Sequence, residues 1–134
     1  MNSKQLSFLS LFVTIGFTIW TIFLPFWDSE KWFLDNRMQS MWLTFDVIFI
    51  IFMLTLTYFI WKEDIMAHFL APLLFGMLLT DWILNISLWV IAGYNLLETR
   101  FILAFIFIII TTTFFFWFFV KIYESKLKES IVSN

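Results

Sequence analysis

The stretch MWLTFDVIFIIFMLTLTYFIW, residues 41–61, is almost continuously apolar and carries a single charged residue, Asp46. A helix needs about 20 apolar residues to cross the hydrocarbon core of a bilayer, which is about 30 Å thick. Within that core the backbone N–H and C=O groups find no water, so a segment that spans it must satisfy them internally as a helix. Residues 41–61 therefore predict a transmembrane helix.

Three further segments of this kind follow from the same pattern: residues 6–26, 69–92 and 101–120. The first is longer than the roughly 7–15 apolar residues of a signal peptide and ends without a small-residue cleavage site, so we expect a retained span. Short connections make successive helices antiparallel. We therefore expect an all-α, integral membrane four-helix up-and-down bundle that forms a single membrane domain over residues 1–134.

The composition agrees with a chain whose main partner is the lipid bilayer. Of its 134 residues 62% are hydrophobic and 13% are charged, whereas soluble domains have about 45–50% and about 25%. The net charge is −2 and the basic residues form no stripe, which excludes a nucleic-acid partner. The chain has no cysteine and one histidine, His68, so we expect no metal site and no cofactor.

The positive charges favour one orientation in the membrane. With the N-terminus inside, five Lys or Arg residues lie on the cytoplasmic side and three on the outer side. The five are Lys4, Lys62, Lys121, Lys126 and Lys128, and the three are Lys31, Arg37 and Arg100. Because positive charges favour the cytoplasmic side, we expect both termini there.

Two acids, Asp46 and Asp81, interrupt the apolar spans. A charge at the centre of a membrane helix costs about 2.5 kcal/mol or more, so such residues normally face a bundle interior and serve a function. At about 1.5 Å per residue, Asp81 falls near the middle of its span and Asp46 about 7 Å to the outer side of its own. Asn85 lies about 6 Å further out than Asp81, at the level of Asp46.

Aromatic and hydroxyl side chains surround these positions. Trp42 is one turn from Asp46 and Trp89 is one turn from Asn85. The first span carries a hydroxyl stripe of Ser7, Ser10, Thr14, Thr18 and Thr21. Hydroxyls in membrane helices more often bond their own backbone or pack against a neighbour than bind a ligand. We expect a ligand-binding pocket that opens to the outer side, lined by Asp46, Asp81, Asn85, Trp42, Trp89 and Thr18.

Motifs of known chemistry are absent. The sequence holds no G-x-S-x-G, P-loop or H-E-x-x-H motif. The first span lacks the acid that small multidrug exporters carry there, and the N-terminal region lacks the glycine-rich pattern of fluoride channels.

Three functions therefore stay open. We favour a protein that binds or transports a lipophilic or cationic small molecule, or a proton. The second is a membrane enzyme that acts on a lipid or isoprenoid with one acid protonated and the other ionised, although the lack of a catalytic cluster counts against an enzyme. The third is an accessory protein whose polar residues only specify helix pairing, with the small-residue face of Gly76, Thr80 and Ser87 as the contact. A homodimer is a further alternative, because four spans barely enclose a pocket.

Overall fold

The computed structural model describes residues 1–26 and 36–132, with side chains up to residue 125. Lys31, and the side chains of Lys126 and Lys128, on which the charge count partly depends, lie outside the described part. The elements are α1 (Ser3–Phe23), the short 3-10 helix η1 (Leu24–Phe26), α3 (Asn36–Trp61), α4 (Met66–Ile91) and α5 (Thr99–Val132).

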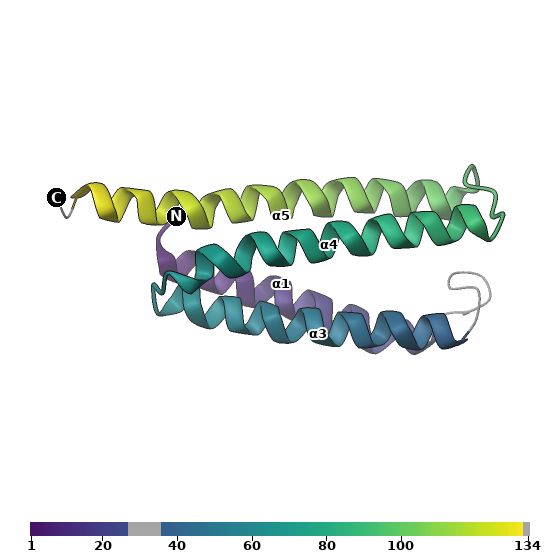
Figure 1. The fold of residues 1–134 in the computed structure, drawn as a ribbon, viewed down its shortest axis with the longest axis horizontal. Helices are drawn as coiled ribbons and strands as arrows, with labels where there is room; N and C mark the ends of the chain where they lie inside the picture. The colour runs from purple at the N-terminus through teal and green to yellow at the C-terminus, as the bar shows by residue number, and fades with distance from the viewer. Residues whose placement is uncertain (27–35, 133–134) are drawn as a thin grey trace.

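Successive long helices run in opposite directions, and the two termini lie at the same end of the bundle (Figure 1). We call this the inner end and the opposite end the outer end. The closest packing is between α1 and α3; α4 packs on α3 and on α5, whereas α1 and α5 approach each other at few positions. The expected all-α, four-helix up-and-down bundle is confirmed.

Each of the four helices is long and apolar enough to cross a membrane. The stretches that qualify are Ser3–Phe26, Asn36–Trp61, Met66–Ile91 and Thr99–Ser125. Large apolar side chains such as Phe8 and Phe12 are more than 70% exposed on the outside of the bundle, where hydrocarbon would solvate them. Four helices of this length and composition are those of a multi-pass membrane protein. The second and third helices begin before the expected spans, at Asn36 and Met66, because helical hydrogen bonding continues into their polar or less apolar first turns.

The turns that separate the helices have identifiable signals. Gly93, with φ 71°, follows α4, and the Tyr94 N–H donates to the carbonyl of Trp89 at 3.1 Å. This is the hydrogen bonding of a Schellman motif, in which the left-handed residue favours glycine. The same pattern ends α3, but the left-handed position is held by Glu63, with φ 56°.

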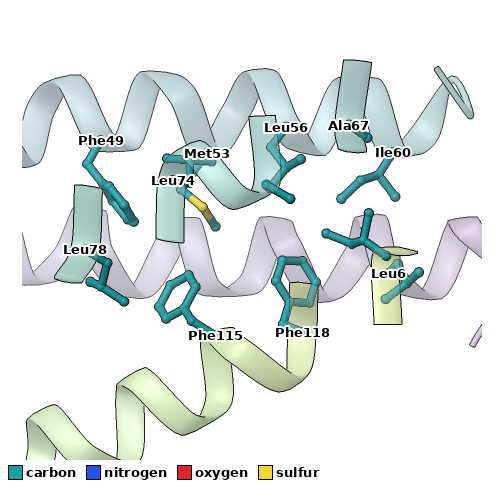
Figure 2. Close-up of a cluster of buried hydrophobic side chains, with 12 residues drawn as sticks. Leu6, Phe49, Met53, Leu56, Ile60, Ala67, Leu74, Leu78, Phe115 and Phe118 are labelled. Atoms are coloured by element: carbon teal, nitrogen blue, oxygen red, sulfur yellow. The ribbon is translucent and has the colours of Figure 1, made fainter. Parts of the chain in front are cut away.

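The inner half of the bundle is filled by a core to which all four helices contribute (Figure 2). Its buried side chains are Leu6, Phe49, Met53, Leu56, Ile60, Ala67, Ala71, Leu74, Leu78, Phe115, Phe118 and Ile122. Because lipid is as apolar as these side chains, dispersion contacts hold them together and hydrophobic burial contributes little.

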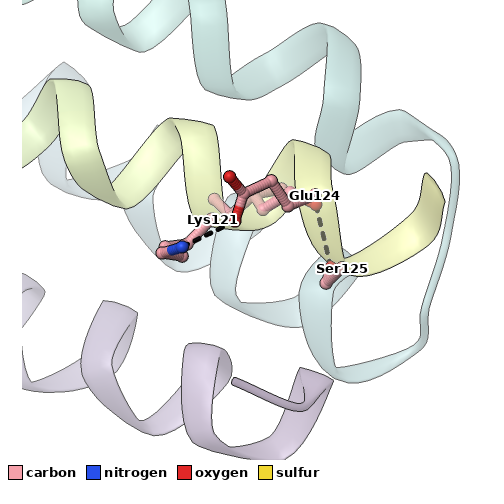
Figure 3. Close-up of polar contacts among 4 residues, drawn as sticks. Lys121, Glu124 and Ser125 are labelled. Atoms are coloured by element: carbon pink, nitrogen blue, oxygen red, sulfur yellow. Dashed lines mark hydrogen bonds and ion pairs between the residues drawn. The ribbon is translucent and has the colours of Figure 1, made fainter. Parts of the chain in front are cut away.

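At the inner end α5 also carries an ion pair between Lys121 and Glu124, with Nζ and Oε2 2.6 Å apart (Figure 3). The pair is partly exposed, so its contribution to stability is small. Packed side chains therefore fill the inner half of the bundle, whereas a cavity occupies much of the outer half.

Candidate functional site

A cavity of about 940 Å³ extends from the middle of the bundle toward the outer end, lined by residues of all four helices. From α3 come Trp42 and Asp46, and from α4 come Asp81, Trp82, Asn85 and Trp89. The remaining wall consists of mostly apolar residues of α1, η1 and α5. The acids thus form a small polar patch in an apolar chamber.

Asp46 and Asp81 lie at the same level of the bundle. Asp46 is fifteen residues before Trp61, the last residue of α3, and Asp81 is fifteen residues after Met66, the first residue of α4. The expectation that Asp81 is about one turn deeper than Asp46 is therefore wrong. The cause is the earlier start of α4, at Met66 instead of Phe69, which places three more helical residues between the α3–α4 turn and Asp81.

Both acids are buried, with 9% of Asp46 and 8% of Asp81 exposed, and their charges are close enough to act on each other. Asp46 accepts a long hydrogen bond from the Thr21 hydroxyl, 3.5 Å between Oγ1 and Oδ2, and one from the Trp20 indole. Asp81 accepts one from the Asn85 amide, with Nδ2 3.4 Å from Oδ1. The hydroxyl, indole and amide groups that donate these hydrogen bonds are all neutral. No cation is therefore among the described groups that bond either carboxyl group.

One cation, Arg100, lines the outer part of the cavity. Its Nε lies 2.9 Å from an oxygen of Glu98, and its guanidinium lies 4.6 Å from the ring centre of Phe101. Glu98 and Arg100 thus form an ion pair where α5 begins. Arg100 is paired with Glu98, and no described ion pair involves Asp46 or Asp81.

Aromatic rings form much of the wall. Trp20 of α1 stacks on Phe107 of α5 with ring centres 6.1 Å apart and planes at 19°. Trp82 meets the same Phe107 edge to face at 6.2 Å. The indole nitrogens of Trp42 and Trp82 are buried and have no hydrogen-bond partner among the described residues.

Five of the six residues expected at the site line this cavity: Asp46, Asp81, Asn85, Trp42 and Trp89. Thr18 does not line it. The Thr18 hydroxyl donates to the carbonyl of Thr14 at 2.8 Å, so it is satisfied within its own helix. The cavity is lined instead by the apolar face of α1.

The rest of the hydroxyl stripe lies at the contact between α1 and α3. The Ser10 and Thr57 hydroxyl oxygens are 2.7 Å apart, and the Ser7 hydroxyl donates to the carbonyl of Thr57 at 3.3 Å. The stripe thus packs one helix against another, the more common role of such residues in membrane helices.

The lining residues that sequence reasoning missed include Trp20, Trp82, Phe107 and Arg100. Trp82 directly follows Asp81, and Trp20 directly precedes the Thr21 that bonds Asp46. This adjacency to a polar position was the signal available. Phe107 and Arg100 lie on an almost uniformly apolar helix and its first turn, where the pattern does not mark one face.

The cavity opens sideways, between α1 and α5. Lining residues on these two helices are exposed, among them Phe12 and Phe23 on α1 and Leu103 on α5. Toward the outer end, buried Leu24, Trp42 and Trp89 line it instead. Among the described residues, the exposed lining side chains therefore lie at the side of the bundle and not at the outer end, where the sequence predicted the opening.

Asp64 and His68 do not line this cavity. Asp64 accepts from the Met66 N–H at 2.9 Å in the turn before α4, while the His68 ring packs edge to face on Tyr123 with centres 5.6 Å apart. Within the described residues no three His, Asp or Glu side chains gather as a metal site would require. Gly76, Thr80 and Ser87 lie on the exposed face of α4.

No protein family, curated protein or solved structure matches this chain.

Proposed function

We propose that the chain binds a lipophilic organic cation in the cavity, with its positive charge at Asp46 and Asp81. The observation that carries the proposal is the pair of buried acids, level with each other and hydrogen-bonded only to neutral groups, beside about 940 Å³ of space. Removing a carboxylate from water is costly unless an opposite charge meets it. A bound cation supplies that charge.

The size and lining of the cavity define the rest of the ligand. Pockets for drug-sized molecules measure about 300–1,000 Å³ and are mainly apolar with a few polar groups. A proton or a bare metal ion leaves such a space unfilled, whereas an organic cation with an apolar body fills it. Rings such as Trp20, Trp82 and Phe107 attract a cation over their faces.

The orientation of the chain is a second part of the proposal. Both termini lie at the inner end, and the distribution of Lys and Arg favours the cytoplasm for that end. The chain has no cysteine, so Ser3→Cys and Leu97→Cys give one thiol at each end. In intact cells a membrane-impermeant maleimide should label Leu97→Cys but not Ser3→Cys, and the reverse pattern contradicts the orientation.

The binding proposal is tested with two probes of nearly equal size and opposite charge, tetraphenylphosphonium and tetraphenylborate. The protein is reconstituted in lipid nanodiscs and binding is measured by equilibrium dialysis, corrected with empty nanodiscs. We expect the cation to bind and the anion not to bind. Equal binding of both probes refutes recognition by charge.

Variants then locate the site. Asp46→Asn and Asp81→Asn keep the side-chain shape and remove one charge each, so each should weaken cation binding at least about tenfold. Glu124→Gln is the matched control, because it removes an acid from the exposed inner end of α5. A double Asp→Asn variant that binds the cation as wild type does excludes this cavity. Transport is measured separately, as cation counterflow into liposomes.

A further inference from the structure

We infer that the ligand reaches the acids from within the bilayer, sideways between α1 and α5, and that the stacked rings of Trp20 and Phe107 are the gate. This inference rests on the proposed binding of a cation and adds the ligand class, a cation dissolved in the membrane. A water-soluble cation that enters from the aqueous side does not belong to that class.

The exposure of the lining residues shows where the cavity is uncovered. The residues contributed by α3 and α4 include buried Asp46, Asp81, Trp42 and Trp89, which form the closed side. The exposed lining residues belong to α1 and α5: Phe12, Ile19, Trp20, Phe23, Leu103 and Phe107. These exposed side chains are all apolar or aromatic and lie within candidate membrane spans, so the uncovered side faces hydrocarbon.

The packing of the helices agrees with an opening at this place. Of the neighbouring pairs in the bundle, α1 and α5 have the sparsest contact, while α1 is held closely by α3 and α5 by α4. A small separation of α1 from α5 therefore disturbs little else. Toward the outer end, in contrast, Leu24 and Trp42 are buried in a cluster that Met38 and Leu88 complete.

The gate itself is the contact of Trp20 with Phe107 at 6.1 Å, which joins the two rims of the opening. The Trp20 indole also donates a hydrogen bond to Asp46. One side chain thus connects the opening to the acid. A cation that arrives at Asp46 competes with the indole for the carboxylate and so weakens one of the contacts that hold Trp20 in place.

The test uses the fact that the chain has no cysteine. Trp20→Cys and Phe107→Cys are combined in one variant, reconstituted in nanodiscs and joined by a short bifunctional methanethiosulfonate that dithiothreitol releases. The association rate of tetraphenylphosphonium is measured by stopped-flow mixing before and after release. We expect the cross-link to slow association at least about tenfold, and release to restore it.

A matched cross-link controls for stiffening of the bundle. Phe75 and Phe116 contact each other at 6.0 Å between α4 and α5 and do not line the cavity. The same reagent on Phe75→Cys with Phe116→Cys should leave the association rate within about twofold of the released state. If both cross-links slow association equally, the gate is refuted.

A second variant acts in the opposite direction and needs no cross-linker. Phe107→Ala removes one ring of the gate and should raise the association and dissociation rates together, each by several fold. Unchanged rates in Phe107→Ala and in the cross-linked gate overturn lateral access while leaving cation binding intact. Absence of tetraphenylphosphonium binding in the wild-type protein overturns the proposed function itself, so the two failures are distinguishable.

Discussion

Asp46 and Asp81 lie level with each other on adjacent antiparallel helices, each fifteen residues from the end of its helix at the α3–α4 turn. Their charges act on each other, and both side chains are buried. The turn fixes this relationship, because any two residues equidistant from it on the two helices meet at one depth. The ligand-free protein thus holds two acids together in an apolar cavity, an arrangement that costs stability.

The first prediction concerns the cost in stability of holding two acids together in an apolar cavity. Asp81→Asn removes one charge and keeps the shape of the side chain, so it should raise the free energy of unfolding of the ligand-free protein by about 1–3 kcal/mol. The measurement is unfolding by sodium dodecyl sulfate in mixed micelles, followed by circular dichroism. The same variant should bind tetraphenylphosphonium more weakly. If the Asp81→Asn protein is less stable than wild type, the two acids do not lower the stability of the ligand-free protein and the prediction is wrong.

The second prediction separates the core from the lipid-facing surface with one kind of substitution. Phe115 is 1% exposed and Phe8 is 73% exposed. Phe115→Ala leaves a cavity among packed side chains and should lower the free energy of unfolding by about 3 kcal/mol. Phe8→Ala should change it by less than about 0.5 kcal/mol, because lipid fills the space. Equal effects of the two substitutions in the mixed-micelle assay contradict the placement of the core.

Much of this arrangement could be predicted from the sequence, for two physical reasons. An apolar run of spanning length can only be helical in lipid, so four such runs predict four helices. A charged residue in such a run is costly unless it faces the interior. Asp46 and Asp81 therefore indicated the interior faces, and Trp42, Asn85 and Trp89 followed from them by helical spacing.

The remaining features depend on how the helices pack, which the pattern does not encode. The level of the acids follows from where α4 begins, and Met66 to His68 extend that helix ahead of its expected span. Thr18 was expected at the pocket because hydroxyls are polar, yet a bond to its own helix satisfies it. The side of the opening follows from the separation of α1 and α5, both of which are apolar on nearly every face.

The third prediction measures the contact between α1 and α3. The Thr57 hydroxyl donates to the carbonyl of Met53 at 2.8 Å, so at the 2.7 Å contact with Ser10 the serine is the donor. A double-mutant cycle of Ser10→Ala and Thr57→Val should give a coupling of about 0.6 kcal/mol, typical of hydrogen bonds between membrane helices. The pair Thr80→Val and Ser87→Ala, on the exposed face of α4, should give none. Coupling near zero for Ser10 and Thr57 means that the stripe does not hold α1 to α3.

The fourth prediction concerns the two turns that end α3 and α4, where the same motif holds different residues. Glu63 has φ 56° and Gly93 has φ 71°, and the left-handed region costs a residue with a Cβ about 1 kcal/mol or more. Glu63→Gly should therefore stabilise the protein by up to about 1 kcal/mol, and Gly93→Ala should destabilise it by a similar amount. Among the described residues, no atom outside the chain neighbours of Gly93 lies within 4 Å of a Cβ added there, so a loss there reports backbone strain and not a steric clash.

Both variants are compared with wild type by unfolding in mixed micelles, and Glu63→Ala serves as the control. Glu63→Ala removes the same carboxylate as Glu63→Gly but keeps the Cβ, so only the glycine should stabilise. If alanine and glycine at position 63 stabilise equally, the carboxylate is the cause, and the left-handed backbone contributes nothing. If Gly93→Ala is neutral, the turn after α4 relaxes without cost, and the position of the outer connection does not depend on that glycine.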